Sequence, residues 1–181
     1  MRSAEDVTEF WFVEHGPEDW YGRDATFDAA LAEQFSSTHS SVARGEAWGW
    51  RQTPQGRLAE IVVLDQFSRQ LHRGSPLAFA QDCMALALAQ EAVAAACDQN
   101  LAPERAAFFY MPYMHAESLI IQDEGVRLFT ALGDQKLLDF MVAHRETIAR
   151  FGRFPFRNKA LGRHSTQEEL AYMEAQDGRM F

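Results

Sequence analysis

Apolar residues recur along the chain at the three- and four-residue spacing that places them on one face of a helix. The periodic stretches are residues 4–15, 24–44, 53–71, 75–99, 103–112, 114–132, 134–151 and 165 onward. Only the short run Ile61–Leu64 resembles a strand, and the length of the stretch around it favours a helix. The pattern therefore predicts an all-α chain of about eight helices.

Polar and special residues at the ends of these stretches mark where helices begin and end. Thr53 and the proline after it combine an N-cap with a favoured first helical residue, and Thr166 with Glu169 forms a capping-box pattern. Gly133 ends one stretch and Asp134 caps the next. Because such connections are short, neighbouring helices are expected to pack as antiparallel pairs. No linker of low complexity interrupts them, so residues 1–181 are predicted to form a single all-helical domain.

Composition narrows the class of protein further. The chain is 47% hydrophobic, which suits a globular core, and its net charge of −9 argues against general nucleic-acid binding. It has no run of 18 apolar residues, and its N-terminus lacks the apolar core of a signal peptide. Cys83 and Cys97 fall in one expected helix, too far apart for a disulfide. A soluble cytoplasmic protein without a membrane partner is expected, and the oligomeric state stays open.

One segment departs from this acidic background. Residues 150–163 carry four arginines and one lysine, and no Asp or Glu occurs from Thr147 to Gln167. Arginine recognises carboxylate and phosphate groups through two parallel hydrogen bonds. The segment is therefore expected either to hold an anionic ligand or to close internal ion pairs with residues such as Asp65, Glu117 and Asp123.

Two further groups of residues carry candidate chemistry. Asp65 and Arg69 share a helix face late in their helix, where the helix dipole disfavours a carboxylate and a nearby cation offsets it. His115 follows Pro112, and on a regular helix it faces the side of Gln122, seven residues on, and points away from Glu117. For both groups a structural contact is the favoured interpretation, and a role in a binding or catalytic site is the alternative.

The remaining candidates are a histidine and a set of tryptophans. His144 shares an apolar helix face with Ile148 and precedes the arginine-dense segment, which suits either a core histidine or an acid–base group. Trp20 follows two acidic residues and is expected either in the core or at the mouth of a pocket. Nucleotide-binding glycine loops, a nucleophile elbow and Cys-x-x-Cys motifs are absent, so neither a cofactor nor a metal site is predicted.

Several of these segments together resemble the bacterial DUF924 family, a family of unknown function, over about residues 6 to 173. The resemblance rests on Phe10-Trp-Phe12, Trp20, Leu64-Asp-Gln-Phe-Ser-Arg69, Tyr110-Met-Pro with His115-Ala-Glu117, His144-Arg145, and the run from Arg150 through Arg157-Asn158 and Arg163 to Thr166. It implies a tetratricopeptide-like α–α superhelix of stacked helix pairs, and no activity. Three positions depart from the family pattern: Ser68 stands where the family usually has proline, Gln70 where it usually has asparagine, and Phe156 where it often has histidine.

Three hypotheses follow for the function. The chain is a binding module for an anionic small molecule or an acidic peptide, or an enzyme acting on an anionic metabolite, or a protein-interaction module whose arginines form internal ion pairs. The candidate ligand-binding residues are Arg69, Arg150, Arg153, Arg157, Asn158, Arg163, Trp20 and Tyr110. The candidate acid–base residues are His115, His144, Asp65 and Glu117.

Overall fold

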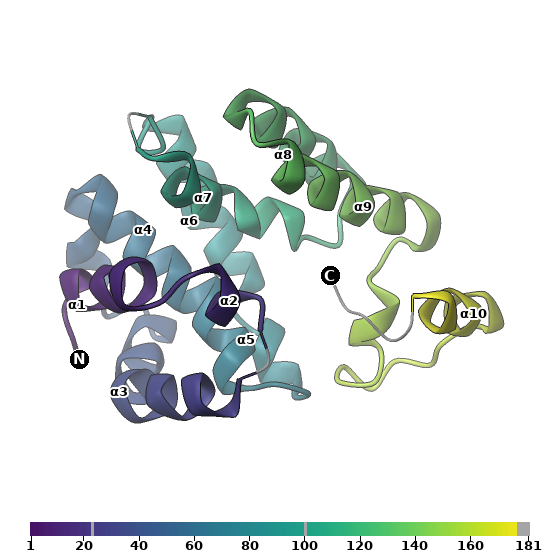
Figure 1. Ribbon diagram of the computed structural model, residues 1–181, viewed down its shortest axis with the longest axis horizontal. Coiled ribbons are helices and arrows are strands. Elements are labelled where there is room, and N and C mark those ends of the chain that lie inside the picture. Colours follow the sequence, from purple (N-terminus) through teal and green to yellow (C-terminus); the bar gives the residue numbers. More distant parts are fainter. Residues whose placement is uncertain (23, 100, 177–181) are drawn as a thin grey trace. The chain divides into compact units, whose positions relative to one another are not determined.

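The computed structural model describes residues 1–22, 24–99 and 101–176 (Figure 1). Every regular element among these residues is helical, so the predicted all-α class is confirmed. By their internal contacts the residues divide into two compact units. Unit 1 comprises Met1–Arg73 and Leu77–Phe109, and unit 2 comprises Gly74–Pro76 and the chain from Tyr110 onward. The single domain predicted over residues 1–181 and the tetratricopeptide-like stacking stay predictions.

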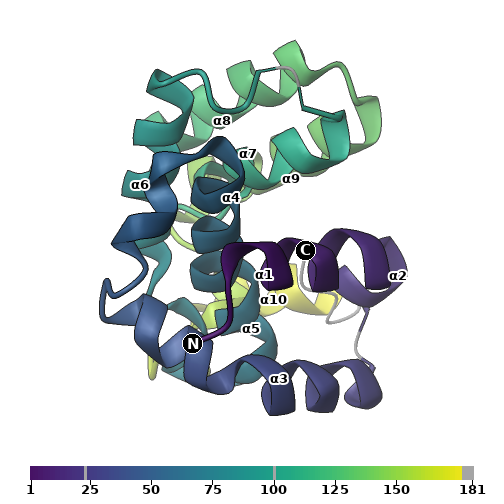
Figure 2. The same ribbon diagram turned by 90° about the vertical axis from the view of Figure 1, so that its left-hand side faces the viewer.

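Unit 1 holds the helices of the first half of the chain. Its α-helices are α1 (Ala4–Glu9), α2 (Pro17–Trp20), α3 (Ala25–Ala43), α4 (Pro54–Val62), α5 (Ser68–Leu71), α6 (Asp82–Ala94) and the first residues of α7 (Pro103–Met114). Helix α4 packs against α1, and α3 packs against α5, as Figures 1 and 2 show. The core of this unit includes the fully buried Trp11, Phe35 and Phe67.

Two stretches of unit 1 are wound as π-helical turns, and both carry motifs singled out above. Phe10–Glu14 extends α1, and Val63–Phe67 joins α4 to α5, so that residues 54–71 form one continuous helical run. Such turns replace the usual i→i−4 hydrogen bonds by i→i−5 bonds and are frequent at functional sites. The Leu64–Arg69 motif and the Phe10–Phe12 motif therefore both lie where the backbone is locally widened.

Unit 2 is built around a helical hairpin. Helices α8 (Leu119–Leu132) and α9 (Gln135–Phe151) pack along each other, and α10 (Gln167–Ala175) follows the arginine-dense segment (Figure 1). The predicted stop and start are both present, because Gly133 adopts a left-handed conformation with φ of 79° and the Asp134 side chain accepts from the Leu137 amide. The close approach of α8 and α9 is possible at Gly125, where an added Cβ would lie 2.8 Å from Met141 Sδ.

Three of the expected helix boundaries are wrong. The helix expected over residues 75–99 is a 3-10 turn followed by α6, which ends at Ala94 because Ala96 adopts a positive φ of 56°. Cys97 therefore lies beyond that helix, although both cysteines are free. No glycine marks this end, so the sequence carries no stop signal there.

The other two errors concern the stretch around Pro112. Helix α7 continues through this proline to Met114, closed by a hydrogen bond from the His115 amide to the Met111 carbonyl. A proline removes one hydrogen bond but need not end a helix two residues from its terminus. The next helix begins only at Leu119, so residues 115–118 form a connection and not the first turn of α8. The short helix α2 was not predicted at all.

Candidate functional site

The arginine-dense segment of unit 2 connects α9 to α10. Gly152 ends α9 in a left-handed conformation with φ of 69°, and Pro155–Arg157 forms a 3-10 turn. At the far end the predicted capping box is present, because Thr166 accepts from the Glu169 amide while the Glu169 carboxylate accepts from the Thr166 amide. The segment is thereby fixed at both ends.

Three arginines of this segment form ion pairs with carboxylates of unit 2. Arg153 contacts Glu169 at 2.6 Å and 2.9 Å. The Arg163 guanidinium donates two hydrogen bonds, of 2.7 Å and 2.9 Å, to the Glu117 carboxylate. Arg150 contacts Glu168 at 2.8 Å, but both side chains of that pair are more than half exposed. Internal pairing, one of the two roles expected for the segment, accounts for these cations.

Arg157 and Asn158 are the buried polar residues of the segment. The Arg157 guanidinium donates to the His115 carbonyl at 2.9 Å and lies over the Phe154 ring, 4.5 Å from its centre. The Asn158 amide nitrogen contacts Ser165 Oγ at 3.0 Å, and its oxygen accepts from Arg163 Nε at 2.9 Å. Asn158 is 1% exposed, so its amide serves the internal network of the segment.

The carboxylates of the network are held in their charged form. The Arg153 hydrogen bonds, together with the Thr166 amide, outweigh burial and lower the pKa of Glu169 to about 2. Burial alone would raise the pKa of Glu117, but hydrogen bonds from Arg163 and the Phe154 amide, and the charges of Arg163 and Arg157, lower it below its usual value. Both groups are therefore acceptors for arginine at neutral pH.

The two candidate histidines of unit 2 lie close together. The ring centres of His115 and His144 are 6.4 Å apart. His144 Nδ1 lies 2.7 Å from the Phe140 carbonyl, and because that oxygen only accepts, Nδ1 carries a proton in this contact. The Phe154 ring packs against His144 with centres 5.5 Å apart.

The expected helical geometry of His115, Glu117 and Gln122 is wrong, because His115 and Glu117 lie in the connection before α8. Gln122 is fully buried and donates to the Met114 and Ala116 carbonyls at 2.7 Å and 2.8 Å. It thus satisfies the carbonyl of the last residue of α7, which lacks a helical partner, and one carbonyl of the connection that follows. Gln122 has a capping role, while Glu117 faces Arg163.

Asp65 and Arg69 form a separate cluster in unit 1. The Arg69 guanidinium lies 3.2 Å from Asp65 Oδ1 and contacts both oxygens of Asp82 at 3.0 Å and 3.1 Å. Burial alone would lower the pKa of Arg69, but the charges of Asp65 and Asp82 raise it. Gln66 donates to Asp65 Oδ2 at 2.5 Å. The expected Asp65–Arg69 pair is present, with Asp82 as an unforeseen third member.

Tyr110, Ser68 and Phe156 lie in packed surroundings. Tyr110 is buried, with its ring centre 5.7 Å from that of Phe129. Ser68 is fully buried; its hydroxyl donates to the Leu64 carbonyl at 2.6 Å and lies 2.8 Å from His39 Nε2. Phe156 lies near Tyr172, with ring centres 6.2 Å apart.

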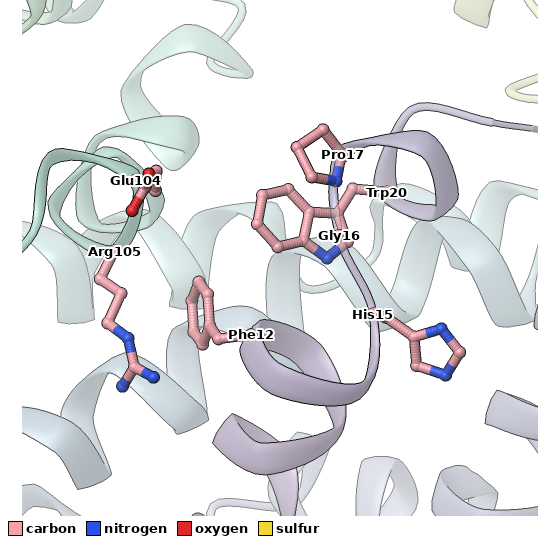
Figure 3. A pocket seen from close by; sticks show the side chains of 7 residues that line it. All are labelled: Phe12, His15, Gly16, Pro17, Trp20, Glu104 and Arg105. Atoms are coloured by element: carbon pink, nitrogen blue, oxygen red, sulfur yellow. The ribbon is translucent and has the colours of Figure 1, made fainter.

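A pocket of about 250 Å³ in unit 1 gathers residues from the corner between α1 and α2 and from the start of α7 (Figure 3). Its lining consists of Phe12, His15, Gly16, Pro17, Trp20, Glu104 and Arg105. Phe12 and Trp20 form its aromatic walls, with ring centres 5.8 Å apart. Trp20 is fixed in place because its Nε1 donates to the Trp11 carbonyl at 2.8 Å.

The polar groups of this pocket are two charges of opposite sign. The Arg105 guanidinium lies over the Phe12 ring, 4.9 Å from its centre, and Figure 3 shows it beside that ring. Within the described ranges, neither Arg105 nor Glu104 forms an ion pair or a hydrogen bond through its side chain. The His15 ring points away from the two charges, toward Asp19, which it contacts at 2.9 Å.

Sequence reasoning placed Trp20 at a possible pocket mouth and missed the other walls. Phe12 belongs to the noted Phe10–Phe12 motif, but its partner Arg105 lies more than ninety residues away in the chain. No local pattern connects the two. Among residues 1–22, 24–99 and 101–176, no group of three metal-ligating side chains is present, and no helix is long and apolar enough to span a membrane.

The chain belongs to the family of bacterial proteins of unknown function called DUF924, whose model matches residues 7–177. One similar solved structure is a protein of unknown function, ATU0120, from Agrobacterium tumefaciens. It is 37% identical, with a TM-score of 0.91, and the match covers 95% of this chain and 97% of that one. A search of curated proteins finds no match.

Proposed function

We propose that this chain is a binding module and that its pocket beside Arg105 takes a small molecule through a carboxylate or phosphate group. The observation that carries the proposal is that Arg105 lies in a pocket without a carboxylate partner among the described residues. Arg153 and Arg163, by contrast, are already paired with Glu169 and Glu117. A guanidinium stacked on an aromatic ring keeps its N–H groups available at the ring's edge for a carboxylate.

The aromatic walls support an organic ligand over a simple inorganic ion. Phe12, Trp20 and Pro17 offer apolar surface, and small-molecule sites combine such surface with a few placed polar groups. The α8–α9 hairpin supports tetratricopeptide-like stacking, and such stacking would also suit an acidic peptide as ligand. The binding experiment therefore includes acidic peptides. We retain the cytoplasm as the expected location.

The experiment is isothermal titration with a panel of aromatic and aliphatic carboxylates, phosphate esters and acidic peptides at matched ionic strength. Arg105→Gln is expected to reduce the affinity for the bound class about tenfold or more. Arg57→Gln is the matched control, because Arg57 is also in unit 1 and its side chain forms no hydrogen bond or ion pair among the described residues. Equal losses in both variants would mean that only net charge matters, which contradicts the proposal.

The arginine-dense segment is the alternative location for the anion. Arg153→Ala and Arg157→Ala are expected to leave the affinity unchanged, because the contacts of both guanidinium groups are internal. A selective loss of affinity in these variants, with Arg105→Gln unaffected, would move the site to residues 150–163. Arg69 is held by Asp65 and Asp82, and the same reasoning applies to it.

A second candidate function is acid–base catalysis on an anionic metabolite in unit 2. The observation in its favour is the separation of 6.4 Å between the His115 and His144 rings, with the Glu117–Arg163 pair in the same unit. A hydrolysis and isomerisation screen tests it. Activity that His144→Asn abolishes, in protein with unchanged circular dichroism, would establish this function, and its absence across the screen would remove it.

A further inference from the structure

We infer that the ligand of the pocket beside Arg105 is a zwitterion, an α-amino acid with a bulky apolar side chain. The inference rests on the proposed function and adds Glu104 to the site. Glu104 and Arg105 are neighbours in the chain, carry opposite charges, and both line the pocket. Among the described residues neither side chain forms an ion pair or a hydrogen bond. Within that part of the chain, the pocket therefore presents one unpaired carboxylate together with one unpaired guanidinium group.

The two side chains leave the start of α7 in different directions. In Figure 3 the Arg105 guanidinium lies beside Phe12, whereas the Glu104 carboxylate lies apart from it. Two opposite charges that do not neutralise each other present two separate points of attachment. An ammonium group and a carboxylate group on one small molecule match such a pair, and each contact gains from being charge-assisted.

A purely anionic ligand fits this pocket less well. Glu104 would repel a carboxylate that approaches Arg105, and the net charge of −9 adds to that repulsion at long range. A zwitterion carries no net charge and so avoids the second penalty. It also turns the Glu104 carboxylate from a repulsive group into an attractive one.

The size and the apolar walls of the pocket determine how large the ligand is and what kind of side chain it carries. A volume of about 250 Å³ lies just below the range of about 300–1,000 Å³ typical of sites for drug-sized molecules. The occupant is therefore a small metabolite. Phe12, Trp20 and Pro17 make the remaining wall apolar, which suits a side chain such as that of phenylalanine or leucine.

The test compares four probes by isothermal titration: L-phenylalanine, L-leucine and the corresponding acids that lack the amino group. At least one amino acid is expected to bind about tenfold more tightly than its des-amino analogue. Glu104→Gln is expected to abolish that preference by weakening only the amino acid. Arg105→Gln is expected to weaken both kinds of probe. Glu91→Gln, an exposed acid of α6 outside the pocket, is the matched control.

The outcomes separate this inference from the proposed function. If a des-amino acid binds as tightly as its amino acid, and Arg105→Gln removes both, the pocket holds an anion and the zwitterion is excluded. If Glu104→Gln and Glu91→Gln have the same effect, Glu104 is not part of the site. If no probe of either kind binds the unaltered protein at millimolar concentration, the amino-acid assignment is overturned, while binding of another anion in the wider panel would leave the proposed function standing.

Discussion

Replacing Glu117 by glutamine tests whether the arginine-dense segment is a structural clamp. The substitution keeps the shape of the side chain and removes its charge. Glu117 accepts two hydrogen bonds from the Arg163 guanidinium and one of 2.7 Å from the Phe154 amide. The variant therefore loses the charge that attracts Arg163 and weakens an anchor of the segment at Phe154.

The expected magnitude follows from how far this pair is removed from water. Breaking a fully buried ion pair costs about 3–5 kcal/mol, and an exposed pair contributes about 0–1 kcal/mol. The side chains of Glu117 and Arg163 are 25% and 23% exposed, which places the pair between these limits. Arg163 also keeps hydrogen bonds to Asn158 and to the Phe154 carbonyl. Glu117→Gln is therefore expected to lower the free energy of unfolding by about 2 kcal/mol.

The chain offers a matched control in the same unit. Glu124 contacts Arg127 at 2.6 Å, but the two side chains are 42% and 62% exposed. Glu124→Gln makes the same chemical change and is expected to cost less than about 0.5 kcal/mol. Urea unfolding followed by far-ultraviolet circular dichroism measures both variants, with the slope of the transition expected to stay constant.

The reasoning is refuted if the two variants unfold at the same urea concentration. A double-mutant cycle with Arg163→Gln then isolates the pair from the other contacts of each residue, and a coupling energy of at least about 1 kcal/mol is expected. A coupling near zero would mean that Arg163 gains nothing from Glu117. The arginine would then be available for an external anion.

Three further predictions concern packing, pH and cooperativity. Gly56→Ala is expected to destabilise by at least about 2 kcal/mol because its Cβ would lie 2.0 Å from the Trp50 carbonyl, and Gly49→Ala, with open space around it, is the control in a thermal melt. Burial and the neighbouring charge of His72 lower the pKa of His39 from 6.5 to about 4. The free energy of unfolding is therefore expected to fall, by up to about 3 kcal/mol, as the pH drops from 6.5 to 4. Urea titrations of His39→Gln are expected to show a weaker dependence on pH over this range. All four tryptophans belong to unit 1, so the single-domain prediction requires tryptophan fluorescence and circular dichroism to show one coincident transition, and two separate midpoints would contradict it.

The helices whose ends carry local signals were predicted well from the sequence. Asp24 caps α3, Thr53 caps α4 and Asp134 caps α9; in each case the side chain accepts a hydrogen bond from the backbone amide two or three residues further along the chain. Capping chemistry depends on residues adjacent in the chain, so a single sequence contains what is needed. The all-α class follows from the same local periodicity.

The errors arise where the decisive interaction is not local. No residue near Ala94 is a typical helix-ending signal, although α6 ends there. The connection at His115–Ser118 follows Pro112, through which helix α7 continues. Gln122 supports that connection by donating to Met114 and Ala116, eight and six residues earlier. A contact of this kind depends on how α8 packs, which helical periodicity does not specify.

The partners of the candidate site residues also depend on contacts between residues that are distant in the chain. A cluster of arginines with no nearby acid drew attention to residues 150–163, yet the carboxylate that holds Arg163 comes from Glu117, 46 positions earlier in the chain. In a chain with 26 acidic and 17 basic side chains, an arginine has an excess of carboxylates to pair with when the chain folds. A high density of arginines therefore predicts ion pairs with carboxylates of the same chain, and does not by itself predict a ligand-binding site. The more informative cation is one that such a chain leaves unpaired beside aromatic walls, and Arg105 meets that description because Glu104, its neighbour in sequence, lies apart from it in the pocket.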